Sequence, residues 1–265
     1  MGLTSWLNGG LVAAETACLS PADRGFTLGD GLFETLRAQG GRVLRLEAHL
    51  ARLAQGAQVL GFALPAYDLR SALTATLAAN ACDAGTLRLT LSRGVGARGV
   101  LPPRVPTPTV LITLAPLPAK AEPARLTLAR RTRRNEMSPL SRIKSLNYLD
   151  NIIARMEADE RGYDDALLLN TQGRVAESSS ANLFLVRAGR LLTPPIAEGA
   201  LPGVRRAALM ARGAEEALLQ PEDLIMAEEM FLTTSLGIRP VAVFEHHHLA
   251  SHLVAERLMA EDFDA

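Results

Sequence analysis

The sequence predicts an α+β protein of two domains. The chain has 265 residues, which is long for one domain and comfortable for two. Hairpin turns and amphipathic helical stretches are mixed along both halves, as is typical of α+β folds. Three prolines fall between 116 and 123, a composition typical of a linker. We therefore expect an N-terminal domain over 1–117, a linker over 118–124 and a C-terminal domain over 125–265.

The first half contains signals for hairpins, helices and strands. Asn8-Gly9 and Gly40-Gly41 are dipeptides that favour tight hairpin turns. Leucine and alanine residues recur at helical spacing from 46 to 60, which predicts an amphipathic helix. The expected elements are hairpins over 3–13 and 31–45, helices over 46–60 and 67–81, and strands over 86–92 and 109–115.

The second half repeats this mixture. Leu149, Ile152, Ile153 and Met156 form an i, i+3, i+4, i+7 stripe, which predicts a helix from about 147 that ends before Gly162. Ala188-Gly189 indicates a hairpin turn. The other expected elements are a strand over 125–130, hairpins over 165–178 and 182–193, a helix after Pro202-Gly203, strands over 229–233 and 240–244, and a closing helix over 250–262.

Composition excludes several classes of function. Lys plus Arg and Asp plus Glu both number 28, and this zero net charge argues against a general nucleic-acid or anionic-membrane binder. Cys18 and Cys82 provide neither a disulfide framework nor metal-ligand spacing, so we expect ordinary thiols and no metal site. Residues 1–8 lack the pattern of a signal peptide, and no apolar stretch approaches the ~20 residues of a membrane helix. We expect a cytoplasmic protein.

One lysine is the first candidate for chemistry. Lys144 is one of only two lysines in the chain, against 26 arginines, and it lies between a basic stretch and an apolar helix start. A lysine that forms an imine needs an amine poised near neutrality, which burial and nearby cations can achieve. Taken alone, a surface lysine at a helix start is the commoner explanation.

Four other segments contain candidate binding groups. Glu177 in VAESSSANLFLV could hold a protonated ring nitrogen. Arg52 in HLARL could pair with a phosphate. GALPGVRR (199–206) opens a helix whose N–H groups suit a phosphate, and TTSLG (233–237) offers hydroxyl groups. Each alone has an ordinary alternative: a polar turn, a solvated charge, a common glycine turn or a polar loop.

The joint order of these motifs resembles the fold type IV pyridoxal-phosphate (PLP) enzymes, the class-IV aminotransferase superfamily. The resemblance covers nearly the whole chain, and it implies an N-terminal α/β sandwich, a C-terminal pseudo-barrel α/β domain, PLP as cofactor and a homodimer. It begins at Asn8-Gly9 and continues through DRGFTLGDGLFETLR (23–37), HLARL (49–53), SRGVGARG (92–99), KSLNYLDN (144–151), DDALLLNTQGRVAESSSANLFLV (164–186), TPPIAEGALPGVRR (193–206) and EEMFLTTSLGIRPV (228–241).

The resemblance also implies roles for individual residues. Lys144 resembles the lysine that holds PLP as a Schiff base and Glu177 the partner of the pyridine nitrogen. Position 205 is often threonine in the aminotransferases and is arginine here, so only a backbone contact to phosphate carries over at this position. The other implied cofactor contacts are Arg52, Gly203, Val204, Arg205, Thr234 and Ser235 around the phosphate, Tyr148 at the ring 3-hydroxyl, and Ser180 and Leu201 around the ring.

The segment Ser92–Gly99 distinguishes members of the superfamily. S-R-G-x-G-x-R-G is more typical of aminodeoxychorismate lyases, and Val100 stands where D-amino acid aminotransferases carry a histidine. The implied reaction eliminates pyruvate from 4-amino-4-deoxychorismate and leaves 4-aminobenzoate, a folate precursor, with Lys144 as general base. Arg98 is the candidate for a substrate carboxylate and Phe33 for an apolar wall of the pocket. The alternative is a class-IV aminotransferase acting on D-amino acids or branched-chain amino acids.

A non-enzymatic interpretation concerns the basic run over 125–144, which contains six arginines besides Lys144. Such a run can mark a nucleic-acid-binding module. The run lacks aromatic residues on which bases could stack, and the whole chain is neutral. We therefore expect no nucleic-acid partner and no membrane partner.

Overall fold

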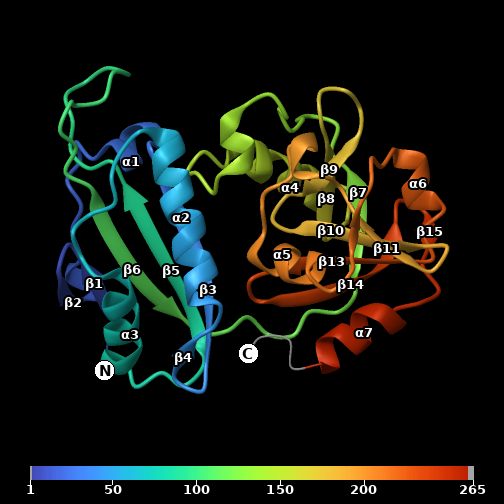
Figure 1. Cartoon of the computed structure of the whole chain (residues 1–265), viewed down its shortest axis with the longest axis horizontal. Helices are drawn as coiled ribbons and strands as arrows, with labels where there is room; N and C mark the ends of the chain where they lie inside the picture. Colours follow the sequence, from blue (N-terminus) through green and yellow to red (C-terminus); the bar gives the residue numbers. More distant parts are fainter. Residues whose placement is uncertain (1, 262–265) are drawn as a thin grey trace. The chain divides into compact units, whose positions relative to one another are not determined.

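The computed structural model describes residues 2–261 (Figure 1). The chain divides into two compact units. Within the described residues, the first takes in 2–118 together with the segment Ile143–Asn147, and the second takes in Ala119–Arg142 and 148–261. The expected domains had placed 143–147 in the C-terminal half, whereas this segment returns to the first unit.

The first unit is built on a six-stranded antiparallel sheet with the order β2-β1-β6-β5-β3-β4. Both predicted hairpins are confirmed. Asn8 and Gly9 have φ of 45° and 109°, and Gly40 and Gly41 have φ of 58° and 66°, so each turn uses two left-handed residues. The strands are β1 (Thr4–Leu7), β2 (Gly10–Ala13), β3 (Gly31–Gln39), β4 (Arg42–Val43), β5 (Gly85–Ser92) and β6 (Thr109–Ala115).

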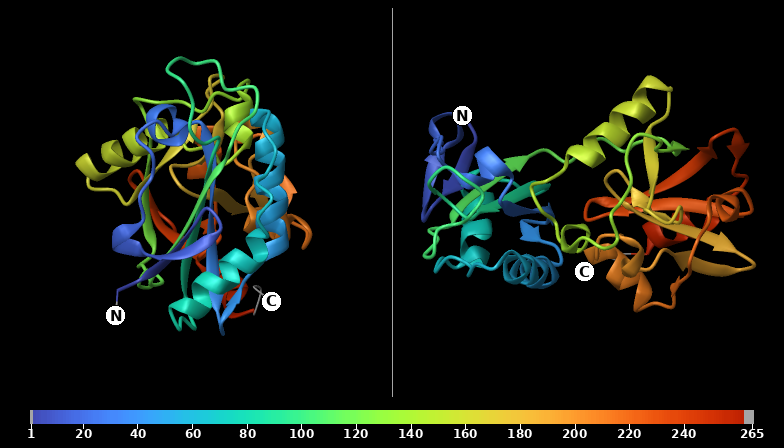
Figure 2. Two further views of the ribbon diagram at one scale, coloured as in Figure 1. Left: turned by 90° about the vertical axis from the view of Figure 1, so that its left-hand side faces the viewer. Right: turned by 90° about the horizontal axis from the view of Figure 1, so that it is seen from above.

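Two helices cover one face of this sheet (Figure 2). They are α2 (Leu46–Leu60) and α3 (Leu69–Ala79), both at predicted positions, and a short α1 (Arg24–Leu28) and the 3-10 turn Ala14–Thr16 precede them. The strictly alternating β5 buries Leu87, Leu89 and Leu91 completely. Because side chains alternate across a strand, Phe33 of β3 and Arg88 of β5 lie on the face opposite to α2 and α3.

The segment 143–147 pairs with the start of β3. Phe33 N–H donates to the Lys144 carbonyl at 2.9 Å, and Leu146 N–H donates to the Gly31 carbonyl at 2.9 Å. A Cβ at Gly31 would meet the carbonyl oxygen of Leu91 in β5 at 2.5 Å and Cδ1 of Leu146 at 2.8 Å. Glycine is therefore required where β3 lies between β5 and this segment. Backbone hydrogen bonds thus fix Lys144 directly beside Phe33.

The second unit contains a mixed sheet with the order β12-β11-β10-β13-β14-β7-β8-β9, and β15 pairs with β14. Four strands separate β10 from β9, about 24 Å in a flat sheet, yet residues 179–181 alone connect them and can span only about 14 Å. The sheet must therefore curl. Its strands are β7 (Ala124–Leu128), β8 (Asp165–Leu169), β9 (Val175–Ser178), β10 (Asn182–Arg187), β11 (Arg190–Thr193), β12 (Glu215–Glu216), β13 (Glu229–Thr234), β14 (Gly237–Phe244) and β15 (His247–His248).

Helices and short turns surround the curled sheet, which confirms the predicted α+β class. Phe184 and Phe231 stack at 5.4 Å between ring centroids, beneath residues of α5 and α7. The expected closing helix over 250–262 corresponds to α7, and residue 262 lies outside the described residues. The helices are α4 (Leu149–Glu160), α5 (Val204–Met210), α6 (Pro221–Ile225) and α7 (Leu253–Ala260), with 3-10 turns at Pro139–Arg142 and Ile196–Glu198.

Helix α4 presents its apolar stripe to solvent. Leu149, Ile152, Ile153 and Met156 are 72, 48, 38 and 54 % exposed. The buried side of α4 instead uses small residues such as Ala154 and Ala158 against β8. The stripe predicted the helix correctly, but the helix packs on its unit through the other face. An exposed apolar stripe of this kind is typical of a protein contact surface.

Candidate active site

Lys144 lies against an aromatic ring in the first unit. The side chain is half-buried, and its Nζ lies 4.4 Å from the ring centroid of Phe33. The guanidinium carbon of Arg88 lies 3.9 Å from the same centroid. Phe33 is buried. An amine and a guanidinium thus both contact one aromatic side chain.

Arg88 was not among the predicted site residues. A signal existed in its strand, because TLRLTLS has an arginine on the face opposite to its three buried leucines. Such a residue is usually a solvated charge, and only the pairing of β5 with β3 places Arg88 beside Phe33. An exposed guanidinium near a candidate catalytic amine can bind a carboxylate through two parallel hydrogen bonds.

Glu177 is the centre of a polar cradle in the second unit. Its carboxylate is buried in β9 and lies 3.1 Å from Nη2 of Arg134. Leu201 N–H donates to Oε2 at 2.9 Å, and Nδ2 of Asn182 lies 3.4 Å from the same oxygen. The curl of the sheet brings Glu177 of β9 next to Asn182 of β10. A carboxylate held by a cation and two N–H donors keeps its negative charge when buried.

The glycine at the start of α5 is required by this cradle. Asn182 Nδ2 donates to the Leu201 carbonyl at 2.9 Å. This hydrogen bond ties the segment that precedes α5 to the start of β10. A Cβ at Gly203 would lie only 2.0 Å from Oδ1 of Asn182. Gly203 is the N-cap residue of α5, and the buried Val204 is the first residue of the helix. The close approach explains glycine at this position.

The start of α5 also contacts the end of β13. Arg205 is buried, and its Nε donates to the carbonyl of Thr234 at 2.9 Å, so its guanidinium joins the two segments. The Thr234 hydroxyl accepts from Leu236 N–H at 3.1 Å. The buried hydroxyl of Thr233 has no hydrogen-bond partner within the described residues. Backbone N–H groups at a helix start and a nearby threonine hydroxyl such as that of Thr234 are groups of the kind that bind a phosphate.

The remaining predicted residues occupy separate places. Tyr148 is half-buried at the N-cap of α4, and its side chain makes no capping hydrogen bond. Ser180 is exposed in the turn between β9 and β10, and its N–H donates to Oγ of Ser178 at 3.3 Å. Ser235 is half-buried between β13 and β14, and Arg98 is exposed in the loop between β5 and β6.

Arg52 is a half-buried partner of a carboxylate rather than a solvated charge. It projects from α2, and its Nε and Nη2 donate to the two oxygens of Glu34 at 2.8 and 2.5 Å. Glu34 was not predicted as a site residue. The only sequence signal was a glutamate within the otherwise apolar stretch GLFETL.

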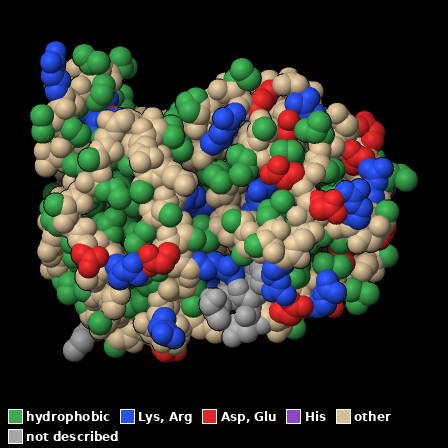
Figure 3. Space-filling view, in the orientation of Figure 1, with side chains coloured by type: hydrophobic (Ala, Val, Ile, Leu, Met, Phe, Trp, Pro, Cys, Tyr) green, Lys and Arg blue, Asp and Glu red, His purple; other side chains and the backbone are tan. Residues whose placement is uncertain are grey.

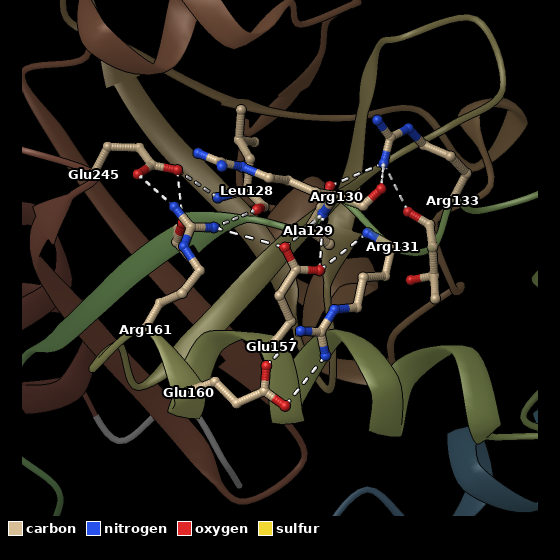
Figure 4. A network of polar contacts seen from close by, with 11 residues as sticks. Leu128, Ala129, Arg130, Arg131, Arg133, Glu157, Glu160, Arg161 and Glu245 are labelled. Atoms are coloured by element: carbon tan, nitrogen blue, oxygen red, sulfur yellow. Dashed lines mark hydrogen bonds and ion pairs between the residues drawn. The ribbon is translucent and has the colours of Figure 1, made fainter.

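Three arginines of the basic run, Arg130, Arg131 and Arg133, make contacts within the second unit (Figure 4). The backbone N–H groups of Arg130 and Arg131 donate to the buried carboxylate of Glu157. Arg131 also pairs with Glu160 at 2.5 Å, and Arg133 donates to backbone carbonyls. On the face shown in Figure 3, acidic and basic side chains are interspersed. The side chains of Arg131 and Arg133 thus have partners within the protein.

Glu136, two residues after Arg134, accepts hydrogen bonds from Thr171 and Gln172. The Thr171 hydroxyl donates at 2.6 Å and its N–H at 3.0 Å, while Nε2 of Gln172 donates at 3.2 Å. The hydrogen bond from the Thr171 hydroxyl is the largest cause that lowers the pKa of Glu136, from 4.5 to about 2. Arg134 and Glu136 lie in the same segment after β7. The hydrogen bonds of Glu136 hold this segment against the turn between β8 and β9.

Glu136→Gln is expected to lower the free energy of unfolding at pH 7 by about 1–3 kcal/mol, since it weakens hydrogen bonds to a charged group. The lowered pKa means that the carboxylate stabilises the fold fully above its unfolded value of 4.5 and loses this effect as pH falls toward about 2. The difference between variant and wild type should therefore shrink across this window. Urea unfolding at pH 7 and about pH 3 measures it, with the exposed Glu256→Gln as control. A difference independent of pH would contradict this assignment.

Other kinds of site find no support in residues 2–261. No group of three or more His, Cys, Asp or Glu side chains in this range could hold a metal ion. Within the same range, each helix is too short or too polar to cross a membrane. Both cysteines are free thiols.

The donor set fits PLP in kind. A lysine amine, a buried carboxylate paired with an arginine, and a helix start linked to the Thr234 segment match in kind the aldehyde, the ring nitrogen and the phosphate of this cofactor. The aldehyde, the ring nitrogen and the phosphate each need a different kind of partner, and the chain contains a partner of each kind.

Comparison with known proteins agrees with this chemistry. The sequence profile of the amino-transferase class IV family matches residues 31–244. A putative branched-chain-amino-acid aminotransferase of Methanocaldococcus jannaschii is 34% identical over 247 residues, which are 89% of this chain and 86% of that protein. The structure of 4-amino-4-deoxychorismate lyase from Pseudomonas aeruginosa is 34% identical with a TM-score of 0.86, covering 98% of this chain and 100% of that one.

The cofactor and the fold follow from the same comparisons. A T.th. branched-chain amino acid aminotransferase, solved with pyridoxamine 5'-phosphate, matches with a TM-score of 0.89 and 27% identity over 98% of this chain and 92% of that one. The small antiparallel sheet and the curled mixed sheet are those of fold type IV, as predicted. The chain is therefore a PLP-dependent member of the amino-transferase class IV family.

Proposed function

We propose that the chain is a 4-amino-4-deoxychorismate lyase, which eliminates pyruvate and leaves 4-aminobenzoate for folate synthesis. Lyase and aminotransferase use the same catalytic groups, so these groups cannot distinguish the two activities. The observation that carries this proposal is therefore the end-to-end match with the Pseudomonas aeruginosa lyase. The motif S-R-G-V-G-A-R-G over 92–99 supports the same choice.

The catalytic role of Lys144 is that of a general base. Bound PLP supplies an aldehyde for the substrate amine and a ring that accepts electrons. The Nζ of Lys144 then removes the proton from the amine-bearing carbon of the substrate. Glu177 would hold the proton on the ring nitrogen, with Arg134 at 3.1 Å as the cationic partner of its carboxylate. Tyr148, Ser180 and Leu201 would surround the ring, while Arg52, the backbone of Val204 and Arg205, Thr234 and Ser235 would bind the phosphate.

Substrate recognition would depend on two arginines of the first unit. The substrate of the lyase is a dicarboxylate, and the chain offers Arg88 beside Phe33 and Arg98 in the loop between β5 and β6. Phe33 would form an apolar wall on which the Lys144 amine rests. Removing Arg88 should therefore raise KM for a carboxylate-bearing substrate more than it lowers kcat.

The second candidate is an aminotransferase for branched-chain amino acids. The relative from Methanocaldococcus jannaschii favours it, with 34% identity over 89% of this chain. An aminotransferase would return the proton to the cofactor carbon and release a keto acid. The histidine typical of D-amino acid aminotransferases is replaced by Val100, which disfavours that variant.

A paired assay distinguishes the candidates. The enzyme with PLP is offered 4-amino-4-deoxychorismate in one reaction, and leucine or D-alanine with 2-oxoglutarate in others. Release of pyruvate and 4-aminobenzoate, without glutamate in the second set, is the expected result. Glutamate formation without release of 4-aminobenzoate would overturn the lyase in favour of the aminotransferase.

We further propose that the chain forms a homodimer through α4. The apolar stripe of Leu149, Ile152, Ile153 and Met156 is exposed, and Met137 of the same unit is 81 % exposed. Ile152→Glu places a charge in this stripe and is expected to raise the dimer dissociation constant about 30-fold or more, since central interface changes cost about 2 kcal/mol or more. Sedimentation velocity measures the change. Val59→Glu, at an exposed position of α2, is the matched control, and equal dimer strength in both variants would refute the interface.

A further inference from the structure

Glu34 is a buried carboxylate that the proposed chemistry does not use. Its side chain is 1 % exposed, on the face of β3 that α2 covers, between the fully buried Leu32 and Leu36. A charged group in such a place persists only when it is paired and hydrogen-bonded, because burial removes its hydration. Both partners of Glu34 come from one helix, α2.

The contacts of Glu34 define a three-residue cluster. Nε and Nη2 of Arg52 donate to Oε1 and Oε2 at 2.8 and 2.5 Å, which is a two-point, planar contact. Nδ1 of His49 lies 2.6 Å from Oε2, and His49 is itself buried. His49 and Arg52 are three residues apart on α2, so their side chains lie on the same face of the helix.

This arrangement fixes the plane of the guanidinium. A single hydrogen bond would let the Arg52 head group rotate, whereas two bonds to one carboxylate hold its plane. Burial raises the pKa of Glu34, but the hydrogen bonds from Arg52 and His49 outweigh it, so the pKa lies below its ordinary value. Glu34 is therefore charged at neutral pH and holds Arg52 as an ion pair.

We propose that Glu34, supported by His49, is a positioning residue that holds the guanidinium of Arg52 in the orientation in which Arg52 binds the cofactor phosphate. This inference rests on the phosphate role proposed for Arg52. A long arginine side chain loses rotamer freedom when it binds, and a head group ordered beforehand loses less. Glu34 and His49 would provide that order without touching the cofactor.

The test compares cofactors with and without the phosphate. Glu34→Gln keeps the size of the side chain but removes its charge and replaces one acceptor oxygen by an N–H donor. The dissociation constants of PLP and of pyridoxal, which lacks the phosphate, are measured by titration of the apoprotein. We expect the constant for PLP to rise about 10- to 100-fold, the range seen for outer partners of metal-binding groups, and the constant for pyridoxal to stay unchanged.

Two further variants make this result interpretable. Glu47→Gln is the matched control, because Glu47 lies on the same helix and pairs with Arg70, but at the surface. It should change neither constant. His49→Gln leaves the pair of Glu34 and Arg52 in place, so we expect the same selective loss of PLP affinity, but smaller. This variant carries the test if Glu34→Gln fails to fold by circular dichroism.

The outcomes distinguish failure of the positioning role of Glu34 from failure of the phosphate role of Arg52. If wild-type protein binds PLP no more tightly than pyridoxal, the phosphate site itself fails and the inference falls with it. If wild type prefers PLP and Glu34→Gln keeps the same preference, only the positioning role is overturned. An equal loss of affinity for both cofactors would also overturn it, because the effect would then be a general loss of structure.

Discussion

Lys144→Ala is expected to lower turnover by about 10³-fold or more while the protein stays folded. The roles proposed for Lys144 are covalent anchor and general base, and removing such a group has effects of this order or larger in other enzymes. Lys144 is held by backbone pairing with β3, which does not depend on its side chain, so circular dichroism should be unchanged. The measurement is the rate of product release with saturating PLP and substrate.

The other lysine of the chain is the natural control. Lys120→Ala removes an exposed amine between the last strand of the first unit and the first strand of the second, and it should leave the rate unchanged. Full activity of Lys144→Ala, or an equal loss in both variants, would contradict the catalytic role of Lys144.

Glu177→Gln is expected to lower kcat by about 10²- to 10³-fold, the size of effect that follows loss of one electrostatic stabiliser. A neutral amide cannot keep the ring nitrogen protonated, and it leaves the charge of Arg134 without its carboxylate partner. PLP should still bind, because the proposed contacts from Lys144 and from the phosphate-binding residues are unchanged. Steady-state kinetics with a separate PLP titration measures the two effects independently.

Glu198→Gln is the matched control for this variant. Glu198 is also a buried glutamate of the second unit, and it pairs with Arg174 and accepts from Asn170 at 2.7 Å. The same chemical change there should reduce stability but leave most of kcat. If both variants lost activity equally, the effect of Glu177→Gln would reflect a damaged fold rather than the ring nitrogen.

Local sequence signals predicted the elements well, because they depend on neighbours along the chain. Asn8-Gly9 and Gly40-Gly41 supply left-handed turn residues, and both hairpins form. The helical spacing over 46–60 and the alternation over 86–92 gave correct elements. The order of motifs then indicated the family, which the match over 31–244 confirms.

Tertiary partners were less accessible to sequence reasoning. The stripe of α4 predicted a helix, but periodicity does not tell whether an apolar face meets the core or another chain. The return of 143–147 to β3 depends on pairing across more than 100 residues. Arg134 looked like one of many charges in a basic run. Its pairing with Glu177 depends on the neighbouring strands β8 and β9 and on the bridge between Arg134 and Asn170 at the end of β8.

The most direct measurement reduces the PLP-loaded protein with borohydride and maps the modified peptide by mass spectrometry. Reduction makes an imine between PLP and a lysine permanent, so the attachment site can be read. We predict a single pyridoxyl adduct on the peptide that contains Lys144. An adduct on Lys120 instead, or no adduct in protein that turns over its substrate with PLP, would contradict the central claim.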